Sequence, residues 1–302
     1  MVPPAISYDL ACFGYLAYAQ VVRVRAYPQA NTGATVAEVI PSLAGDAPIT
    51  ALTATRLGHR TCLVANRVSL DPPGQAVLDT LDAAGVVHRS MPAAPGGGTP
   101  QLTIVTDEAG TRTWFAWLGA AVDQLISVDL TPLRAARLAY VDCYRIIEHA
   151  AAAAIAATEV PLLLNLGGDP LSATIAAAVV DRHVAFVQTN AEEPDLDRAE
   201  ALVADLYSRM GARAAVVTLG RHGALACAAT GTYRTAAPTV AIRHTHGAGA
   251  AFSGGLAHAY LTGANITEAL QAGCAAGTAH CAAVPSIPRP RTPTVVSKES
   301  HP

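Results

Sequence analysis

The segment "HTHGAGAAFSGG", residues 244–255, combines residue types that suit anion chemistry. Two glycines that flank an alanine, followed by small apolar residues, are typical of a loop that leads into the N-terminus of a helix. Free backbone N–H groups at such an N-terminus bind phosphate and other anions. The pattern therefore predicts an anion hole formed by Gly247, Ala248 and Gly249. The next residue is Ala250, whose methyl group cannot accept a proton, although chemistry at such loops usually needs a proton acceptor nearby.

Three other side chains are candidates for that proton acceptor. His244 and His246 lie within the segment, and a neutral imidazole is a competent base near pH 7. The alternative is that these histidines are solvated or structural. Asp46 precedes an apolar helical pattern, so it either caps that helix or forms a hydrogen bond with an acceptor substrate. The His-Thr-His pair alone is a poor metal motif, because two ligands spaced i, i+2 in a loop need further ligands.

The composition narrows the class of protein. The chain has 302 residues, of which 51% are hydrophobic and 14% charged, which describes a compact globular protein. A net charge of -3 without a basic block gives no indication of nucleic-acid binding, and no apolar run is long enough to cross a membrane. Six scattered cysteines without a CxxC pair, and an N-terminus without a signal-peptide pattern, lead us to expect a cytoplasmic protein with reduced, buried thiols.

Short apolar strands alternate with helical segments along the chain, which favours a mostly parallel sheet covered on both faces. The predicted strands are 8–24, 60–68, 136–143, 160–167, 183–190 and 213–220, and a hairpin is predicted over 223–237. The predicted helices are 46–58, 72–85, 149–158, 171–181, 250–263 and 265–284. The last helix has a capping box formed by Asn265 and Glu268.

Two β-rich segments, residues 15–43 and 98–118, interrupt this alternation, and we expect them to form a small sheet over the carboxyl edge of the large one. Ligands bind at that edge in such folds. Arg112 and Trp114 are two residues apart in the second segment, so their side chains share one face of the strand. They either pack within the lid or at a dimer contact, or form a wall on which a ring stacks. The loops expected to converge at this edge follow Gly45, Asn165, Asn190, Gly220 and Thr245.

Four motifs, in this order and spacing, resemble the signatures of the PfkB (ribokinase-like) family of sugar and nucleoside kinases over nearly the whole chain. They are "AGDAPITALTATRLG", "TNAEE", "VVTLGRHGALA" and "HTHGAGAAFSGG". The resemblance implies a single Rossmann-like α/β domain over 1–285 with a β-sheet lid, and leaves a Pro-rich tail, 286–302. It also implies ATP as donor, Mg²⁺, a primary alcohol as acceptor, and a homodimer through the lid.

The resemblance also assigns roles to individual residues. Asn190 and Glu193 match the network of magnesium and phosphate-bound water, with Glu193 acting on Mg²⁺ through water. Thr218, Leu219, Gly220 and Gly223 match the wall of the adenine-nucleotide site, and Gly247, Ala248 and Gly249 match the anion hole. The residues expected around the acceptor substrate are Gly45, Asp46, Asn165, Arg112 and Trp114.

The departures from the family pattern lie on the acceptor side. Ala250 replaces the catalytic Asp, and His244 replaces an Asp tied to a monovalent-cation site. Ala19 and Ile49 replace an Asp and an Asn that bind the sugar, and "NLG" at 165–167 replaces a D-x-N element.

Three interpretations stay open for a small-molecule partner such as a sugar, a nucleoside or a phosphorylated derivative. The first is a kinase with a displaced base and an unusual acceptor. The second is a repurposed enzyme of specialised metabolism on the same scaffold. The third is a pseudokinase that binds nucleotide or phosphate without turnover.

Overall fold

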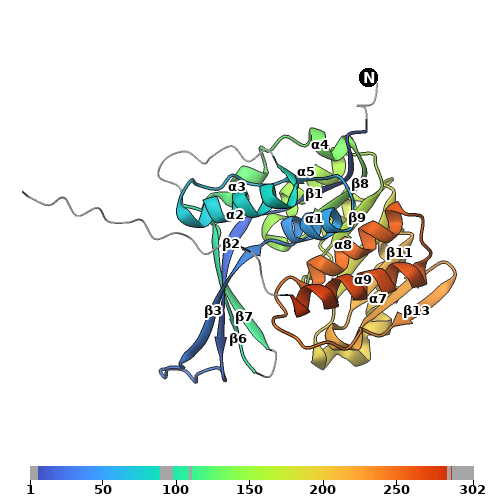
Figure 1. Cartoon of the computed structure of the whole chain (residues 1–302). Coiled ribbons are helices and arrows are strands. Elements are labelled where there is room, and N and C mark those ends of the chain that lie inside the picture. The colour runs from blue at the N-terminus through green and yellow to red at the C-terminus, as the bar shows by residue number, and fades with distance from the viewer. Residues whose placement is uncertain (1–5, 89–97, 109–110, 284–286, 288–302) are drawn as a thin grey trace, which may run out of the picture.

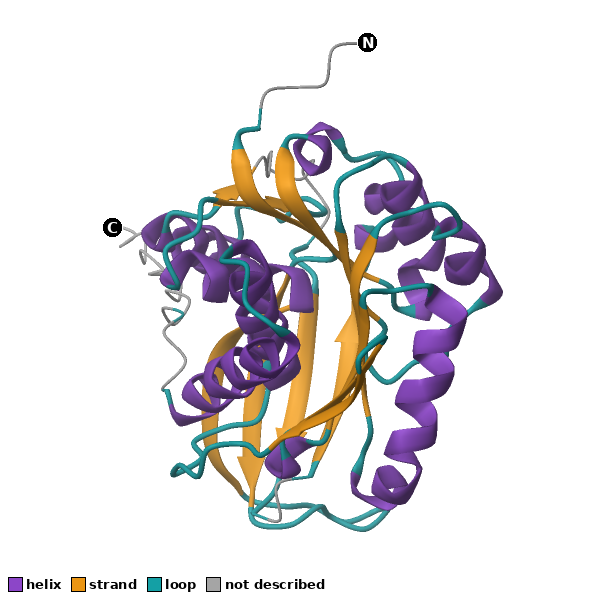
Figure 2. Ribbon diagram, turned by 90° about the vertical axis from the view of Figure 1, so that its right-hand side faces the viewer, coloured by secondary structure: helices purple, strands orange, loops and turns teal. Residues whose placement is uncertain are grey.

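The computed structural model describes residues 6–88, 98–108, 111–283 and 287. These residues form a nine-stranded sheet with helices on both faces and a four-stranded sheet that projects from it (Figure 1; Figure 2). This confirms the predicted α/β fold with a β lid. Within the described ranges, no helix is long and apolar enough to cross a membrane. Of the predicted tail, 286–302, only Ile287 lies among the described residues.

The large sheet has the strand order β13-β12-β11-β10-β9-β8-β1-β4-β5 and is parallel except at β12 and β13, which form the predicted hairpin. Its inner strands are short, nearly continuous apolar runs, as a sheet covered on both faces requires. The bounds are β1 (Tyr8–Phe13), β4 (Thr61–Val64), β5 (Val87–His88), β8 (Ala136–Asp142), β9 (Leu162–Asn165), β10 (Val184–Asn190), β11 (Ala214–Thr218), β12 (Ala224–Ala228) and β13 (Gly231–Thr235).

Different helices cover the two faces. One core cluster contains the buried residues of α1 (Asp46–Arg56), α2 (Pro72–Ala84), α8 (Ala248–Leu261) and α9 (Ile266–Ala282). The other contains those of α3 (Ala121–Leu125), α4 (Thr131–Arg134), α5 (Glu148–Ala156), α6 (Ala173–Ala178) and α7 (Ala199–Met210). Short 3₁₀ turns lie at η1 (Arg145–Ile147), η2 (Glu193–Arg198) and η3 (Gly220–His222). The predicted capping box of Asn265 and Glu268 is present at the start of α9.

The predicted first strand, 8–24, is wrong as a single element. The chain leaves the large sheet after β1 and enters the lid as β2 (Ala17–Val24). At the crossing, Asn66 accepts a hydrogen bond from Leu16 N (2.7 Å) and donates one to Leu16 O (3.0 Å). These bonds satisfy buried backbone groups where no strand partner is available. The hydrophobic pattern runs through this break because both sheets bury the segment.

The lid has the strand order β3-β2-β6-β7, with β3 (Val36–Ala44), β6 (Gln101–Thr106) and β7 (Arg112–Trp117). Its strands come from the two segments predicted for it, and they extend away from the body in Figure 1. One face of the lid is buried near its root, where Ala19, Val21 and Ile104 pack in a small core with Leu118. Residues 109 and 110 of the turn predicted between β6 and β7 lie outside the described residues.

Candidate active site

Two helices begin side by side at the carboxyl edge of the large sheet. The hydroxyl of Thr50 on α1 donates to the carbonyl of Ala250 on α8 (3.0 Å). One turn further along, a Cβ at Gly254 would lie 2.6 Å from the Cβ of Thr53. The residue numbers on both helices increase from the contact 50–250 to the contact 53–254, so α1 and α8 run parallel. Their positive N-terminal ends therefore point to the same region, beneath the lid.

The predicted anion hole has the geometry of an anion site. Gly247 adopts a left-handed conformation (φ 78°), and α8 starts there without a side-chain cap from any described residue. Within the described part of the chain, the N–H groups of Gly249 and Ala250 have no acceptor, and a Cβ at Gly249 would meet open space. The loop is held from behind, because Gln188 and Ser253 both donate to the carbonyl of Gly249 (3.1 Å each). Free amides, a helix N-terminus and open space together fit a phosphate group.

Asp46 is the first residue of α1 but does not cap it. The N-cap is Gly45, with φ 96°, and it has no side-chain cap bond. The capping alternative is therefore wrong. The Oδ2 atom of Asp46 instead accepts a hydrogen bond from Asn165 Nδ2 (2.9 Å), which also faces the hydroxyls of Tyr140 (2.9 Å) and Tyr144 (3.3 Å). The structure thus joins Asp46 and Asn165, both of which the sequence analysis expected around the acceptor substrate, by a hydrogen bond and adds two tyrosines.

The residues predicted for the nucleotide lie at the ends of β10 and β11. Asn190 ends β10, and its Nδ2 donates to Glu192 Oε1 (3.2 Å), not to Glu193. Glu193 pairs with Arg221 (2.5 Å) and His222 (3.3 Å) of η3, and these contacts, that with His222 first, hold the pKa of Glu193 below its usual value. Thr218 ends β11. Gly220 (φ 52°) and Gly223 (φ 89°) turn the chain after it, and a Cβ at Gly223 would collide with Thr235 O.

Residues 8–288, nearly the whole chain, match the sequence pattern of the pfkB family carbohydrate kinases. The chain belongs to this family.

Individual relatives agree with this assignment. A nucleoside kinase of Methanothermobacter thermautotrophicus is 28% identical over 113 residues, which is 37% of this chain and 36% of that protein. A nucleoside kinase of Burkholderia thailandensis in complex with inosine is similar in structure, with a TM-score of 0.75, 19% identity, and coverage of 94% of each chain. Arabidopsis thaliana ribokinase complexed with ribose and ATP has a TM-score of 0.71, 20% identity, and coverage of 95% of this chain and 96% of that one.

The histidines of this PfkB-family site form a cluster around one carbonyl. His246 Nε2 donates to the carbonyl of Leu43 at the root of the lid (2.9 Å). The carbonyl of His246 accepts from His280 Nε2 of α9 (2.9 Å) and His244 Nδ1 (3.2 Å). Burial lowers the pKa of His246 and of His280 to about 4 and also lowers the pKa of His244. All three imidazoles are therefore neutral at pH 7, and the low pKa makes His246 a weak base.

Asp142, which the sequence analysis missed, ends β8 in the middle of this edge. It is fully buried, and its oxygens accept hydrogen bonds from the Tyr140 hydroxyl (2.6 Å) and the backbone N–H of Ala47 (3.0 Å). Burial, and then the charge of Asp46, raise the pKa of Asp142 well above its usual value. The available signal was an Asp that closes an apolar strand, "ARLAYVDC", at the edge where ligands bind.

Two predicted acceptor-side residues come from the lid. Arg112 reaches the loop before α8, where it donates to Thr245 O (3.3 Å) and lies 4.0 Å from a carboxylate oxygen of Glu192. Trp114, on the same strand, is 59% exposed. Arg112 therefore links the lid to the loop of the anion hole, whereas the role of Trp114 stays a prediction.

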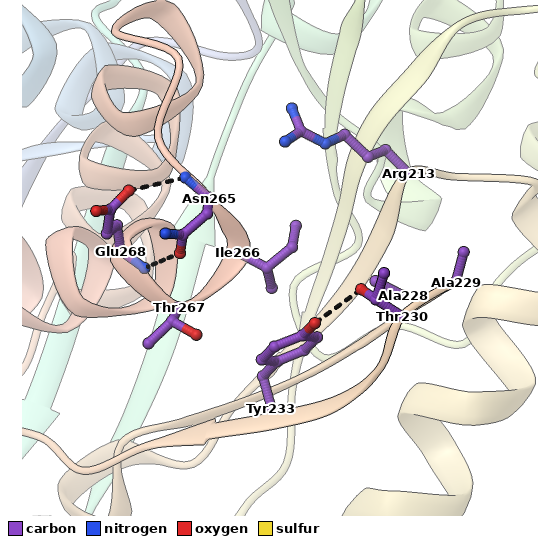
Figure 3. Close-up of a pocket in the computed structure, with 9 residues that line it drawn as sticks. All are labelled: Arg213, Ala228, Ala229, Thr230, Tyr233, Asn265, Ile266, Thr267 and Glu268. Atoms are coloured by element: carbon purple, nitrogen blue, oxygen red, sulfur yellow. Dashed lines mark hydrogen bonds between the residues drawn. The ribbon is translucent and has the colours of Figure 1, made fainter.

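A hollow of about 730 Å³ lies elsewhere, between the start of α9 and the β12–β13 hairpin (Figure 3). Arg213 lines it and immediately precedes β11, so the hollow is at the amino edge of the sheet, opposite the anion hole. Asn265 and Glu268 at its rim bond to each other's backbone N–H groups.

Among the described residues, no three His, Cys, Asp or Glu side chains are grouped to hold a metal ion.

Proposed function

We propose that the protein transfers the γ-phosphoryl group of ATP to a hydroxyl of a sugar- or nucleoside-like small molecule. The observation that carries this proposal is the start of α8, where the amides of Gly249 and Ala250 have no acceptor among the described residues and a Cβ at Gly249 would meet open space. Family membership supports it, as do the relatives, one described with ribose and ATP and one with inosine. Catalysis at such a site consists mainly of positioning and charge stabilisation, which loop amides and a helix N-terminus supply.

On this proposal, the nucleotide lies along the ends of β10 and β11, against Thr218, Gly220 and Gly223. Asn190 and Glu193 face the metal-bound phosphates, and Glu193 acts on Mg²⁺ through water. Carboxylate and amide oxygens are suitable for this metal, which usually keeps several of its waters. When bound, Mg²⁺ neutralises charge on the phosphates.

A pseudokinase is the second candidate, and one observation favours it. Ala250 is completely buried, and the neighbouring Ile49 side chain reaches the anion loop, since a Cβ at Gly247 would lie 2.7 Å from Ile49 Cδ1. The place of the family's catalytic carboxylate is therefore closed by apolar packing. A general base typically contributes about 10²–10⁴-fold to the rate, so its loss slows phosphoryl transfer without removing nucleotide binding.

We also propose a homodimer through the lid. Trp114, Phe115 and Trp117 on the edge strand β7 are 55–66% exposed, and Val36 and Val39 on the opposite edge strand β3 are 41–47% exposed. Large apolar side chains exposed along both edges of a small sheet are typical of an interaction surface. Sedimentation of the wild type beside Trp114→Ser/Phe115→Ser tests this, with a dimer expected only for the wild type.

The function is tested in two stages. Calorimetry with ATP and ADP, with and without Mg²⁺, measures binding, and coupled ADP release with a panel of pentoses, hexoses and nucleosides measures turnover. Binding together with acceptor-dependent ADP release supports the kinase. Binding without turnover on any acceptor supports the pseudokinase, and the absence of affinity for any nucleotide or phosphorylated metabolite contradicts both.

A further inference from the structure

The parallel packing of α1 and α8 places one carboxylate beyond the start of α8. Thr50 lies beside Ala250, and Asp46 lies four residues earlier on α1. Four residues of α-helix advance about 6 Å along the axis. Asp46 therefore extends about one turn past Ala250, to the level at which the loop of the anion hole begins. Asp46 approaches the loop from α1, where Asn165 contacts its carboxylate.

We propose that the Asp46 carboxylate accepts the proton of the acceptor hydroxyl, in place of the carboxylate missing at position 250. This inference rests on the proposed kinase function and deepens it. It assigns the proton-accepting role to the neighbouring helix, so that the reaction keeps a base although the α8 position holds a methyl group.

The hydrogen bonds of Asp46 leave one of its oxygens for a substrate. Oδ2 accepts from Asn165 (2.9 Å), which fixes the orientation of the carboxylate, while Oδ1 accepts no hydrogen bond from the described residues. The side chain is only partly buried. Its place in the first turn of α1 favours a negative charge, because the helix dipole is positive there. Asp46 is thus an oriented carboxylate with a free acceptor atom at the site.

The neighbouring carboxyl group supports the same assignment. Asp142 is enclosed by Tyr140 OH, Ala47 N and the tightly packed Gly14, which leaves no room for a substrate hydroxyl beside it, and burial raises its pKa. Of the two carboxyl groups, the partly exposed Asp46 is therefore the one that a substrate can reach. The histidines are weaker candidates, because His246 uses Nε2 to donate to Leu43 O and has a pKa of about 4.

The step balances as follows. The O–H bond of the acceptor breaks and its proton passes to Asp46 Oδ1. The acceptor oxygen forms a bond to the γ-phosphorus of ATP while the bond between that phosphorus and the β–γ bridging oxygen breaks. ADP leaves with that electron pair, and Asp46 returns its proton to water.

The test compares Asp46→Asn with Asp46→Glu, because the two variants differ in charge. Asp205→Asn on the exposed face of α7 is the control, since among the described residues the Asp205 carboxylate pairs only with Arg209 on its own helix, and Ser208 donates to the backbone carbonyl of Asp205. We expect kcat of Asp46→Asn to fall about 10²-fold or more, with KM for ATP within a few-fold of the wild type. Asp46→Glu retains a larger share of kcat than Asp46→Asn, and Asp205→Asn matches the wild type.

Chemical rescue separates a base from a structural role. In Asp46→Ala, added formate is expected to restore part of kcat, while chloride at equal ionic strength has no effect. An unchanged kcat in Asp46→Asn overturns the proposal, and so does an equal loss in Asp46→Glu and Asp46→Asn without rescue by formate. If the wild type shows no turnover with any acceptor, the kinase function itself fails and the inference falls with it. An active wild type with an equally active Asp46→Asn variant overturns the inference alone.

Discussion

The nucleotide half and the acceptor half of this site differ in what happened to their polar residues. At and just after the ends of β10 and β11, Asn190, Glu193 and Thr218 carry polar side chains, and each of these residues is exposed or partly exposed. On the proposed acceptor side, Ala19, Ile49 and Ala250, which the family resemblance aligned with Asp or Asn, are all buried in apolar packing. At these three positions the proposed acceptor half is therefore part of the core.

The proposed acceptor half is not apolar throughout. Asp46, Asn165, Tyr140 and Tyr144 form a connected hydrogen-bond cluster, with Asp142 beneath it. These polar groups lie at the ends of β8 and β9, in the segment after β8 and at the start of α1. We therefore expect the two halves of the site to respond separately to substitution, because the phosphate site depends on backbone geometry and the acceptor site on side chains.

The largest expected effect concerns the shared anion hole. Gly249→Val places a side chain in the open space that a phosphate would fill, so we expect at least a 10²-fold loss of ATP affinity in calorimetry with the melting temperature nearly unchanged. Gly247→Val is the matched comparison, because its left-handed φ and the contact with Ile49 cost folding stability instead. Equal ATP affinity of Gly249→Val and the wild type would show that the phosphate binds elsewhere.

A second effect concerns the new polar cluster. Asp142→Ala leaves Tyr140 OH and Ala47 N without their acceptor in a buried place, and we expect about 3 kcal/mol of destabilisation in urea unfolding. Asp142→Asn keeps one acceptor oxygen at this place, so we expect a smaller loss of stability.

The stability of Asp142→Asn relative to the wild type is expected to change with pH. Because the pKa of Asp142 is raised in the folded state, the native protein holds a proton that the unfolded chain releases near pH 4. The stability of the wild type is then lost as pH rises above 4 towards the folded-state pKa, and Asp142→Asn lacks this loss. Stability of Asp142→Asn relative to the wild type should rise between pH 4 and pH 8. A constant difference would mean that Asp142 is ionised throughout.

A third effect tests whether the acceptor half can be reverted. Ala250→Asp puts a carboxylate into a fully buried position, so we expect a lower melting temperature and little gain in ADP release. Adding Ala19→Asp and Ile49→Asn restores polar neighbours and should recover more activity than the single change. A gain of about 10²-fold or more from Ala250→Asp alone would show that the site lacks only a base.

The sequence predicted the fold well where signals are local. The capping box of Asn265 and Glu268 and the two lid segments are confirmed, since helix ends and strand patterns are written in neighbouring residues. The split of the first strand between two sheets was missed, because burial in either sheet gives the same apolar pattern. Asn66 forms hydrogen bonds with the backbone of Leu16, 50 residues earlier in the chain, so neighbouring residues do not reveal its role.

The site shows the same division. The glycine pattern of the anion loop is local, and its geometry fits the predicted anion site. His280 and Tyr140 reach the site only through the packing of α9 and β8, so no motif marks them. For Asp46, an Asp before a helix predicts a cap and a site residue equally well. The structure excludes the cap, because Gly45 is the N-cap of α1 and the carboxylate accepts a hydrogen bond from Asn165 instead.

The smallest expected effect is the response to monovalent cations. The family pattern has a carboxylate where His244 stands, and hard cations prefer anionic oxygen ligands. Burial lowers the pKa of His244, so the side chain is neutral at pH 7, and its Nδ1 faces the carbonyl of His246 (3.2 Å), which leaves no negative charge on this side chain to attract K⁺. Activity and melting temperature in KCl, NaCl and tetramethylammonium chloride at equal ionic strength should therefore agree within about twofold and about 1 °C. A specific stimulation by K⁺ would locate the cation at backbone carbonyls, and His244→Asp would then be expected to increase it.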